Sequence, residues 1–384
     1  MVGVRNKNEG KVTVAVPKIA IVHDWLTVAG GAEVVVAELH KLFPKAPIYT
    51  SVFNPKALPG LKGLDIRTTY LQEKIPAKLR YKHILWPTLR AKAFRALDLS
   101  EFDVIISSSS AEAKAVRKTR PDQVHIAYIH TPIRYYWSHY EEFKKEFKLG
   151  IFTPFIRPVI PYFVKRMRVL DLESIKDIDV IIANSEVTQA RIKQYYKRSS
   201  TVVHPPVDVE RFTPPPKGDR SGYILWGRHV PYKRFDLAVE ACNKLGAQLT
   251  IIGSGTDTAR LKKLAGPTIT FTGRVSDKEL VRLAQSAKGF LFPNEEDFGI
   301  SAVESLAAGT PVIAYAKGGA LDIVQDGETG VLFKDQTVES LVAAMKRFET
   351  LSFLPATLHR KAKRFDKRLF DTRILKIVAD SIQQ

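Results

Sequence analysis

The chain has 384 residues, of which 45% are apolar, so it can bury a large core, and disorder along its whole length is excluded. This length predicts two or three domains. Lysine and arginine number 59 against 40 aspartates and glutamates, and the net charge of +19 favours a nucleic acid, a phosphate-bearing substrate or an acidic membrane as partner. A single cysteine, Cys242, excludes an internal disulfide and a cysteine-clustered zinc site, and is typical of a reducing compartment.

The sequence shows no sign of a membrane span. Residues 1–18 lack the apolar core of a secretory signal peptide. The most apolar region, 149–164, is broken by Arg157 and several prolines and falls short of the about 18 apolar residues that a spanning helix needs. We therefore expect a soluble chain, or one that associates with a membrane without crossing it.

Short β-branched runs alternate with longer helical stretches along the chain, and each run has the pattern of a buried strand that ends in a polar or small residue. The predicted strands are 18–25, 102–110, 125–132 and 179–186, then 221–228, 248–255, 268–274, 289–295 and 310–319. Helices are expected between them, for example at 234–246 and 277–287. This alternation is typical of parallel sheets with helices on both faces, and it predicts an α/β chain of two doubly wound domains.

A proline-rich segment separates the two halves. Five prolines fall between Pro205 and Pro216 without usable periodicity, so we expect a linker near residues 205–220. A final helix is expected from about Lys361 onward. Because ligands of doubly wound sheets bind beyond the carboxyl ends of the strands, the loops after the predicted strands are expected to face a shared cleft between the domains.

The loop after the first strand combines His23-Asp24-Trp25 with two adjacent glycines, Gly30 and Gly31, that open a helix. Glycines at such a turn let the backbone approach a ligand, and a helix N-terminus favours an anion. The same glycines are also typical of an ordinary turn. The pattern is no G-x-G-x-x-G and lacks the acidic residue that a dinucleotide ribose requires, which argues against a nicotinamide enzyme.

The strand 221–228 ends in Gly227-Arg228, and Lys233 follows five positions later at the start of the next helix. A guanidinium and an ammonium at a helix start suit a diphosphate, because both can reach its oxygens and the helix adds a partial positive charge. The alternative, an ordinary solvated basic turn, is equally compatible with the charge.

Two carboxylates, Glu296 and Glu304, are separated by seven residues across a loop and the helix expected from about Gly299. The unpaired N–H groups of residues 299–302 would lie between them, next to two acceptors suited to sugar hydroxyls. An ordinary acidic helix start is the alternative, but Glu304 stands among apolar residues, where an unpartnered carboxylate is costly. The pattern therefore favours a ligand site.

These motifs, in this order, resemble retaining glycosyltransferase family 4 from about Ile19 to Phe365. The residues that carry the resemblance are HDWLTVAGGAE, YIHTPIRYYW, Asn184-Ser185, VPYKRFDLAVEA, PNEEDFGISAVESLAAGTPVIAY and GGALDIV. The family has the GT-B fold, two Rossmann-like domains facing a central cleft. Within it the motifs are similar to bacterial mannosyltransferases that extend polyprenyl-diphosphate-linked glycans for surface polysaccharides, which implies GDP-mannose as donor.

The resemblance also implies roles for residues of this chain. Arg228 and Lys233 would neutralise the donor diphosphate and the leaving nucleotide, where negative charge develops. Glu296 would hold hydroxyls of the transferred sugar, Glu304 would accept from the ribose, and His130 would contact the sugar near its primary hydroxyl. The remaining contacts would come from Gly30 and Gly31 to the phosphates, from the backbone at Phe298, Gly299 and Ile300, from Arg274 and Val275 to the base, and from Asp24 to the acceptor.

By the same resemblance, residues 1–205 would bind the acceptor, residues 206–363 would bind the nucleotide sugar, and residues 364–384 would form a helix that returns to the first domain. Transfer would retain the anomeric configuration by a front-face path, with the leaving phosphate helping to deprotonate the acceptor. No protein nucleophile, metal or cofactor is then expected, since Arg228 and Lys233 can replace a divalent cation. Carboxylate pairs catalyse in glycosidases, but here Glu296 and Glu304 are assigned to donor binding.

The remaining charge is concentrated in the first half. Between Lys74 and Arg95, basic residues alternate with aromatic ones and no acid intervenes; the expected membrane contacts are Lys78, Arg80, Lys82, Trp86 and Arg90. A second such region spans 143–168. Both suit an interfacial segment on anionic lipid, at the inner face of the cell membrane, with a lipid-linked acceptor. A solvated basic helix with inward-facing aromatics is the alternative.

Other classes of protein explain less of the sequence. A nucleic-acid-binding protein would account for the charge but not for the Glu296/Glu304 pair or the glycine-rich loops, so no nucleic acid partner is expected. A nucleotide-sugar epimerase of the same fold would keep the donor site and need no acceptor. A sugar phosphorylase would require a cofactor lysine site, which the sequence does not show.

Overall fold

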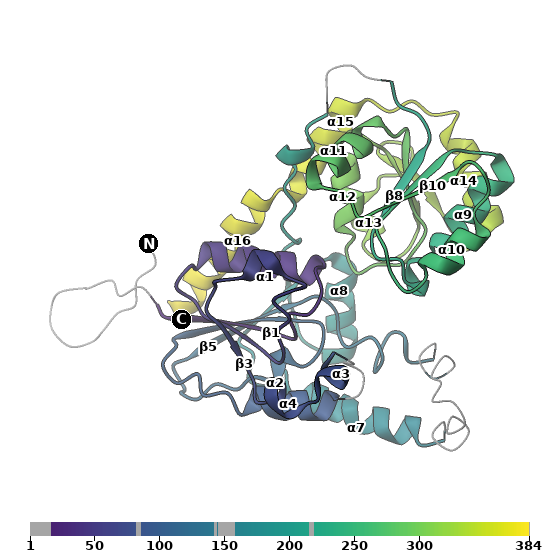
Figure 1. Ribbon diagram of the computed structural model, residues 1–384. Coiled ribbons are helices and arrows are strands. Elements are labelled where there is room, and N and C mark those ends of the chain that lie inside the picture. The colour runs from purple at the N-terminus through teal and green to yellow at the C-terminus, as the bar shows by residue number, and fades with distance from the viewer. Residues whose placement is uncertain (1–16, 82–85, 142–143, 145–157, 215–218, 384) are drawn as a thin grey trace. The chain divides into compact units, whose positions relative to one another are not determined.

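The computed structural model describes residues 17–81, 86–141, 144, 158–214 and 219–383. The chain forms two compact units (Figure 1), the first made of Met1–His204 with Asp371–Gln384 and the second of Pro205–Phe370. Each unit contains one parallel β-sheet packed with helices, so the predicted α/β class with two Rossmann-like domains is confirmed. No helix within these ranges combines the length and apolar character that a bilayer crossing requires.

The first unit has a seven-stranded sheet of order β3-β2-β1-β4-β5-β6-β7, in which all pairs are parallel. Its central strands are buried β-branched runs, as expected for a sheet covered on both faces. The strands are β1 (Ile19–His23), β2 (Ile48–Thr50), β3 (Ile66–Thr68), β4 (Val104–Ser109), β5 (Val124–Ile129), β6 (Val180–Ala183) and β7 (Thr201–Val202).

Helices cover both faces of this sheet: α1 and α16 lie above it in Figure 1, and α3, α4 and α7 lie below. The helices of the first unit are α1 (Gly31–Leu42), α2 (Leu71–Lys74), α3 (Ala77–Arg80), α4 (Pro87–Arg95), α7 (Ile160–Glu173) and α8 (Glu186–Arg191), with short turns η1 (Pro59–Leu61) and η3 (Ala113–Ala115) and the π-helix η5 (Ile192–Tyr196). The last helix, α16 (Lys367–Ile382), begins in the second unit and places its residues from Asp371 onward in the first.

The second unit has a six-stranded parallel sheet of order β10-β9-β8-β11-β12-β13 over one large apolar core. Its strands are β8 (Tyr223–Trp226), β9 (Leu249–Ile252), β10 (Ile269–Gly273), β11 (Gly289–Phe292), β12 (Val312–Tyr315) and β13 (Gly330–Phe333). Its helices are α9 (Phe235–Leu245), α10 (Thr258–Leu264), α11 (Asp277–Ser286), α12 (Ile300–Ala307), α13 (Ala320–Ile323), α14 (Val338–Phe348) and α15 (Pro355–Ala362), with turns η6 (Glu210–Phe212), η7 (Pro231–Lys233) and η8 (Lys363–Phe365).

Because every strand of a sheet runs in the same direction, the loops that follow the strands gather at one edge of that sheet. In the second unit this edge carries Arg228 after β8, Arg274 after β10 and Glu296 after β11. In the first unit it carries Asp24 after β1 and His130 after β5. Most of the predicted site residues therefore lie at these two edges.

Candidate functional site

In the second unit, two loops approach each other through backbone atoms at the end of β11 and β12. Gly318 forms an isolated bridge with Glu296, and the Gly319 N–H donates to the Glu296 carbonyl at 2.8 Å. A Cβ on Gly319 would lie 2.2 Å from the Phe298 carbonyl oxygen, which is closer than any real contact. The Gly318-Gly319 turn therefore fixes the backbone that presents Glu296, and only glycine fits there.

The Glu296 side chain is held by two partners. Its Oε1 atom forms an ion pair with the Lys233 ammonium, and it accepts a hydrogen bond of 2.9 Å from the Asn294 amide. Both charged side chains are mostly buried, with 15% of Lys233 and 21% of Glu296 exposed. The expected phosphate-binding cation and the expected sugar-binding carboxylate thus contact each other.

Arg228 differs from Lys233 in that it is exposed, at the end of β8. Within the described ranges, no carboxylate lies at ion-pair distance from its guanidinium and no hydrogen bond of its side chain is found. A guanidinium without an internal partner keeps its five N–H donors for an external anion.

Helix α12 begins where the sequence predicts. Gly299, which precedes it, has φ of 110°, a left-handed conformation that favours glycine, and the Phe298 side chain is buried against Phe365. The Ala302 N–H was predicted to be unpaired, but it donates to the Gly299 carbonyl and is therefore not available to a ligand. The earlier N–H groups at Ile300 and Ser301 have no acceptor within the helix.

Glu304, on α12, accepts from the Trp226 indole at 3.1 Å and pairs with the Arg211 guanidinium at 3.3 Å. Arg211 also pairs with Asp277 at 3.1 Å. Burial raises the pKa of Glu304 to about 7, against the opposing effects of the Arg211 charge and the Trp226 hydrogen bond. The carboxylate is therefore close to half ionised at neutral pH.

Arg274 and Val275 follow β10 at the outer edge of this sheet. Arg274 is exposed, whereas Val275 is half-buried and packs against the core. They follow a strand that pairs only with β9 in this sheet, and the expected contact with the base stays a prediction.

In the first unit, Asp24 does not have the expected form of an acceptor-binding residue. Its side chain is buried, with 1% of the residue exposed. The two carboxylate oxygens accept five hydrogen bonds from the segment after β4, namely from the Ser109 hydroxyl, the Ser110 N–H and hydroxyl, and the N–H groups of Ala111 and Ala113. The carboxylate replaces the missing backbone partners of that loop, so the prediction of acceptor contact was wrong.

His130 follows β5 and is nearly buried, with 8% exposed. Its Nε2 lies 2.8 Å from the Ser108 hydroxyl, and its carbonyl accepts from the Thr188 hydroxyl at 3.2 Å. Gly30 has an extended conformation, φ of −161°, that any residue adopts, and Gly31 begins α1 with an exposed backbone. The glycines thus do not serve an unusual turn, and the Glu33 carboxylate lies close to Gly30 at the start of α1.

The structure corrects one of the expected membrane contacts. Arg90 is 5% exposed, pairs with Glu112 at 2.8 Å and lies over the Trp25 ring, so it cannot face lipid. Arg80 donates to the Ile75 carbonyl, and Trp86 packs on a small core cluster while donating to the Leu79 carbonyl. Lys82, the Lys78 side chain and most of the region 143–157 lie outside the described residues.

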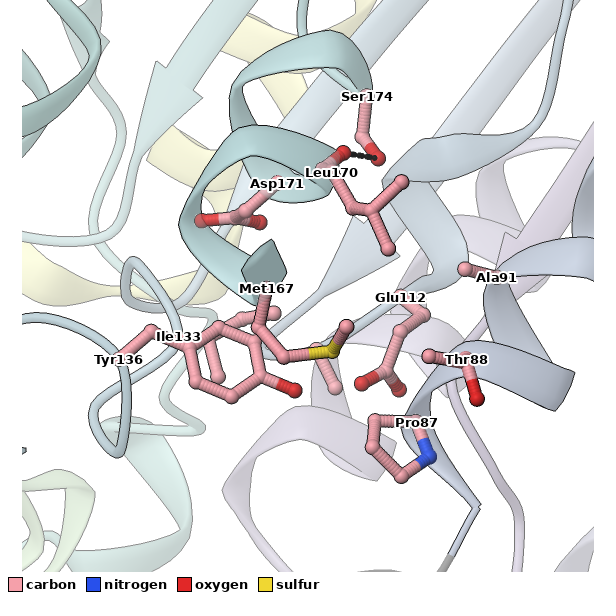
Figure 2. Close-up of a pocket in the computed structure, with 11 residues that line it drawn as sticks. Pro87, Thr88, Ala91, Glu112, Ile133, Tyr136, Met167, Leu170, Asp171 and Ser174 are labelled. Atoms are coloured by element: carbon pink, nitrogen blue, oxygen red, sulfur yellow. Dashed lines mark hydrogen bonds between the residues drawn. The ribbon is translucent and has the colours of Figure 1, made fainter. Parts of the chain in front are cut away.

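Glu112, the partner of Arg90, lines a cavity between α4 and α7 (Figure 2). The Glu112 carboxylate, the Tyr136 ring and the Met167 side chain are turned toward it. The cavity measures about 20 Å³, which is room for about one water molecule and not for a sugar. Burial raises the pKa of Glu112 while the Arg90 charge opposes the shift, as expected of an internal ion pair.

Three residues that contact or adjoin Glu296 and Glu304 were not marked by any motif in the sequence. Asn294 directly precedes the acidic pair and could have been noticed as an amide next to a carboxylate. Trp226 appeared only as a strand residue, and Arg211 lies in the proline-rich segment, where no pattern marked it. No group of three or more histidine, cysteine, aspartate or glutamate side chains suited to a metal occurs in the described part of the chain.

Two family models match successive parts of the chain. Residues 29–211 match Glycosyltransferase Family 4, and residues 206–365 match Glycosyl transferases group 1. The matches meet at residues 206–211, which lie at the start of the second unit.

Curated relatives are similar over a shorter stretch. A GDP-mannose-dependent alpha-(1-6)-phosphatidylinositol monomannoside mannosyltransferase of Mycobacterium tuberculosis is 31% identical over 198 residues, 44% of this chain and 51% of the relative. A D-inositol 3-phosphate glycosyltransferase of a Nocardioides species is 28% identical over 208 residues, 44% of this chain and 45% of the relative. The chain thus spans about half the length of the curated relatives it matches.

Solved structures match nearly the whole chain at low identity. Anabaena Alr3699/HepE in complex with UDP aligns with a TM-score of 0.70 at 16% identity, over 94% of this chain and 100% of that one. Sucrose-phosphate synthase of Thermosynechococcus elongatus aligns with a TM-score of 0.69 at 17% identity, over 94% and 98%. At this identity the likeness establishes the fold.

Proposed function

Because the chain belongs to the family 4 glycosyltransferases and has their GT-B fold, we propose that it transfers a hexose from a nucleotide diphosphate donor to a membrane-associated acceptor. The donor proposed first is GDP-mannose and the acceptor a polyprenyl-diphosphate-linked glycan or lipid. The observation that carries the proposal is the edge of the second sheet, where the exposed Arg228 and the Lys233–Glu296 pair combine cations for a diphosphate with a carboxylate for hydroxyls. Membership of this enzyme family sets aside the alternative of a non-enzymatic nucleic-acid-binding protein.

In the proposed reaction, Arg228 and Lys233 bind the diphosphate and stabilise the charge that develops on the leaving phosphate. Glu296, held by Asn294, accepts hydrogen bonds from the sugar, and Glu304 accepts from the ribose. Transfer proceeds with retention through a front-face path, without a protein nucleophile or a resident metal. The first unit receives the acceptor, and Gly30 and Gly31 keep their proposed role toward the donor phosphates.

The identity of the donor rests on the relatives. The mycobacterial relative is named for its dependence on GDP-mannose, and this supports GDP-mannose for this chain. HepE was crystallised with UDP, so a uracil donor is the alternative with the same chemistry. Thermal shift and donor hydrolysis across a panel of nucleotide sugars, with and without a chelator, test both the base and the metal; conversion of the sugar without acceptor would indicate an epimerase instead.

Arg228→Met tests the donor site. We expect kcat/KM for the donor to fall by about a hundredfold or more, because a fixed cation at the leaving group is lost. The melting temperature should not change, since Arg228 is exposed and lacks an internal partner. Arg282→Met is the matched control, because Arg282 is a surface guanidinium paired with Glu279 away from the site. Unchanged transfer in Arg228→Met would contradict the assignment of the donor site.

Membrane association is proposed for α7 in place of the segment around Arg90. One face of α7 is buried at Ile160, Val164 and Met167, while the opposite face exposes apolar side chains. The exposed apolar residues are Val159 at 54%, Tyr162 at 73%, Phe163 at 43% and Val169 at 52%. Lys165 and Arg166 are exposed on the same helix, so an anionic bilayer complements both the apolar surface and the charge.

Sedimentation with vesicles tests this surface. The protein should pellet with vesicles that contain anionic lipid, and less so as salt increases. The double variant Tyr162→Ser, Phe163→Ser should bind several-fold more weakly, whereas Leu354→Ser, which removes an equally exposed apolar side chain from the second unit, should bind as the wild type does. Failure to pellet at low salt would contradict the membrane assignment and leave the donor chemistry untouched.

A further inference from the structure

A chain of polar side chains connects three strand ends in the first unit. The Nδ1 atom of His23, at the end of β1, lies 2.9 Å from the Ser108 carbonyl oxygen and 3.2 Å from the Ser108 hydroxyl on β4. The same hydroxyl lies 2.8 Å from Nε2 of His130, which follows β5. Ser108 is fully buried and His23 is 2% exposed, so water does not compete for these bonds.

The positions of the hydrogens follow from what each group can donate. A carbonyl oxygen only accepts, so Nδ1 of His23 carries its hydrogen. A buried hydroxyl must find an acceptor for its own proton. Among the described residues, the Ser108 hydroxyl meets only the two ring nitrogens, and the His23 nitrogen is already a donor. The Ser108 hydroxyl therefore donates to Nε2 of His130.

The charge around His23 is compatible with this order. Glu33, at the start of α1, lies 3.9 Å from Nε2 of His23, and Asp24 is the neighbouring carboxylate. Although burial acts to lower it, the pKa of His23 is raised by the Glu33 carboxylate and, more weakly, by Asp24. Since Nδ1 keeps its hydrogen in both protonation states of the ring, the titration of His23 does not change the direction of the hydrogen bonds from His23 to Ser108 and from Ser108 to His130.

We infer that His23 and Ser108 are positioning residues that fix His130 as the tautomer with an unprotonated Nε2 and a hydrogen on Nδ1. Hydrogen on both nitrogens would leave the buried Ser108 hydroxyl without an acceptor, so the neutral ring is also favoured. The consequence for sugar binding rests on the role proposed above for His130, which would then donate from Nδ1 to a sugar oxygen rather than accept from a hydroxyl.

The chain supplies a matched control on the same strand. Ser107 lies 2.8 Å from Nε2 of His125, a second buried serine–histidine pair. Because successive side chains of a strand point to opposite faces, this pair lies on the other face of the sheet from Ser108. Ser107→Ala and Ser108→Ala therefore remove the same kind of hydrogen bond, one outside the proposed site and one within it.

Long-range ¹H–¹⁵N spectra of histidine-labelled full-length protein report the tautomer of His130 directly, with its signals assigned by comparison with His130→Gln. In the wild type we expect a protonated Nδ1. Ser108→Ala should give a mixture of tautomers and lower kcat/KM for the donor by about fivefold to tenfold, the size of one hydrogen bond. Ser108→Thr, which keeps the hydroxyl, should restore the wild-type signal, and Ser107→Ala should leave both readouts unchanged.

A hydrogen on Nε2 of His130 in the wild type would overturn the inference, as would an unchanged tautomer in a folded Ser108→Ala variant. The spectra need neither donor nor acceptor. Absence of transferase activity together with a protonated Nδ1 would therefore contradict the proposed function while supporting the hydrogen-bond order.

Discussion

In the proposed donor site, a diphosphate would compete with the Glu296 carboxylate for the Lys233 ammonium, because the two side chains form an ion pair. In Glu296→Gln, Lys233 no longer has to leave a charged partner when phosphate binds. We therefore expect the bare nucleoside diphosphate to bind more tightly to this variant than to the wild type. The sugar nucleotide should bind more weakly, because the amide is a poorer acceptor for the sugar hydroxyls.

The size of each effect follows from the burial of the pair. Since 15% of Lys233 and 21% of Glu296 remain exposed, solvent screens the pair in part, and we assign it about 1 kcal/mol. This corresponds to about fivefold tighter binding of the diphosphate. Hydrogen bonds to a charged group contribute about 1.5–3 kcal/mol, so the sugar nucleotide should bind about twofold to thirtyfold more weakly on balance.

Isothermal titration calorimetry with GDP and GDP-mannose measures both affinities. If another nucleotide sugar of the panel is the preferred donor, that sugar nucleotide and its nucleoside diphosphate are used instead. Glu295→Gln is the control: it removes a neighbouring carboxylate from the same loop, and the loss of one negative charge should shift both ligands in the same direction. Opposite shifts for the two ligands are expected only at Glu296. If Glu296→Gln weakened both ligands, or tightened both, the competition would be refuted.

Three further outcomes test the site. Because the pKa of Glu304 is raised to about 7, the folded state holds a proton that the unfolded chain releases near pH 4.5; the free energy of unfolding should therefore fall as pH rises from about 4.5 to 7 and level off above 7, and Glu304→Gln should lose this slope in denaturation curves. Asp24→Ala leaves the backbone N–H groups of Ser110 and Ala113 without acceptors and should lower the free energy of unfolding by about 2 kcal/mol or more; a stable variant that lost only acceptor binding would restore the original prediction. Gly319→Ala should abolish donor binding in calorimetry, because its methyl group would collide with the Phe298 carbonyl, whereas Gly60→Ala, whose methyl group meets nothing within 4 Å, should bind normally.

The sequence predicted the strands and helices that carry the donor residues because these elements have strong patterns. The strand before Glu296 is a run of buried residues, and the left-handed glycine before α12 marks the helix start. Strand β13 was not predicted, and neither were strands β2, β3 and β7, which have only three, three and two residues, too few to show a period. These three short strands pair at the sides of the first sheet, where tertiary contacts rather than local pattern determine the structure.

The errors concern residues whose partners are distant in the sequence. Asp24 follows a strand in a loop of polar and aromatic residues, which suits a binding site, but its donors come from a serine-rich segment 85 to 89 positions later. Arg90 stands among basic and aromatic residues, which suits a lipid surface, but Glu112 and Trp25 enclose it. Residue type and spacing do not distinguish a charged side chain that binds a ligand from one that stabilises the fold.

Charge pairing at the donor edge bears on the order of events in the proposed reaction. In the described part of the chain, Glu296 has Lys233 and Glu304 has Arg211, while Arg228 has no carboxylate. An incoming diphosphate should therefore meet Arg228 first and then draw Lys233 away from Glu296, which frees that carboxylate for the sugar. After transfer the nucleoside diphosphate no longer carries the hexose and its hydroxyls, so Glu296 keeps only the Asn294 amide and regains Lys233 when the product leaves. The same pair that opposes diphosphate binding should thus favour product release, and Glu296→Gln should retain its product longer than the wild type.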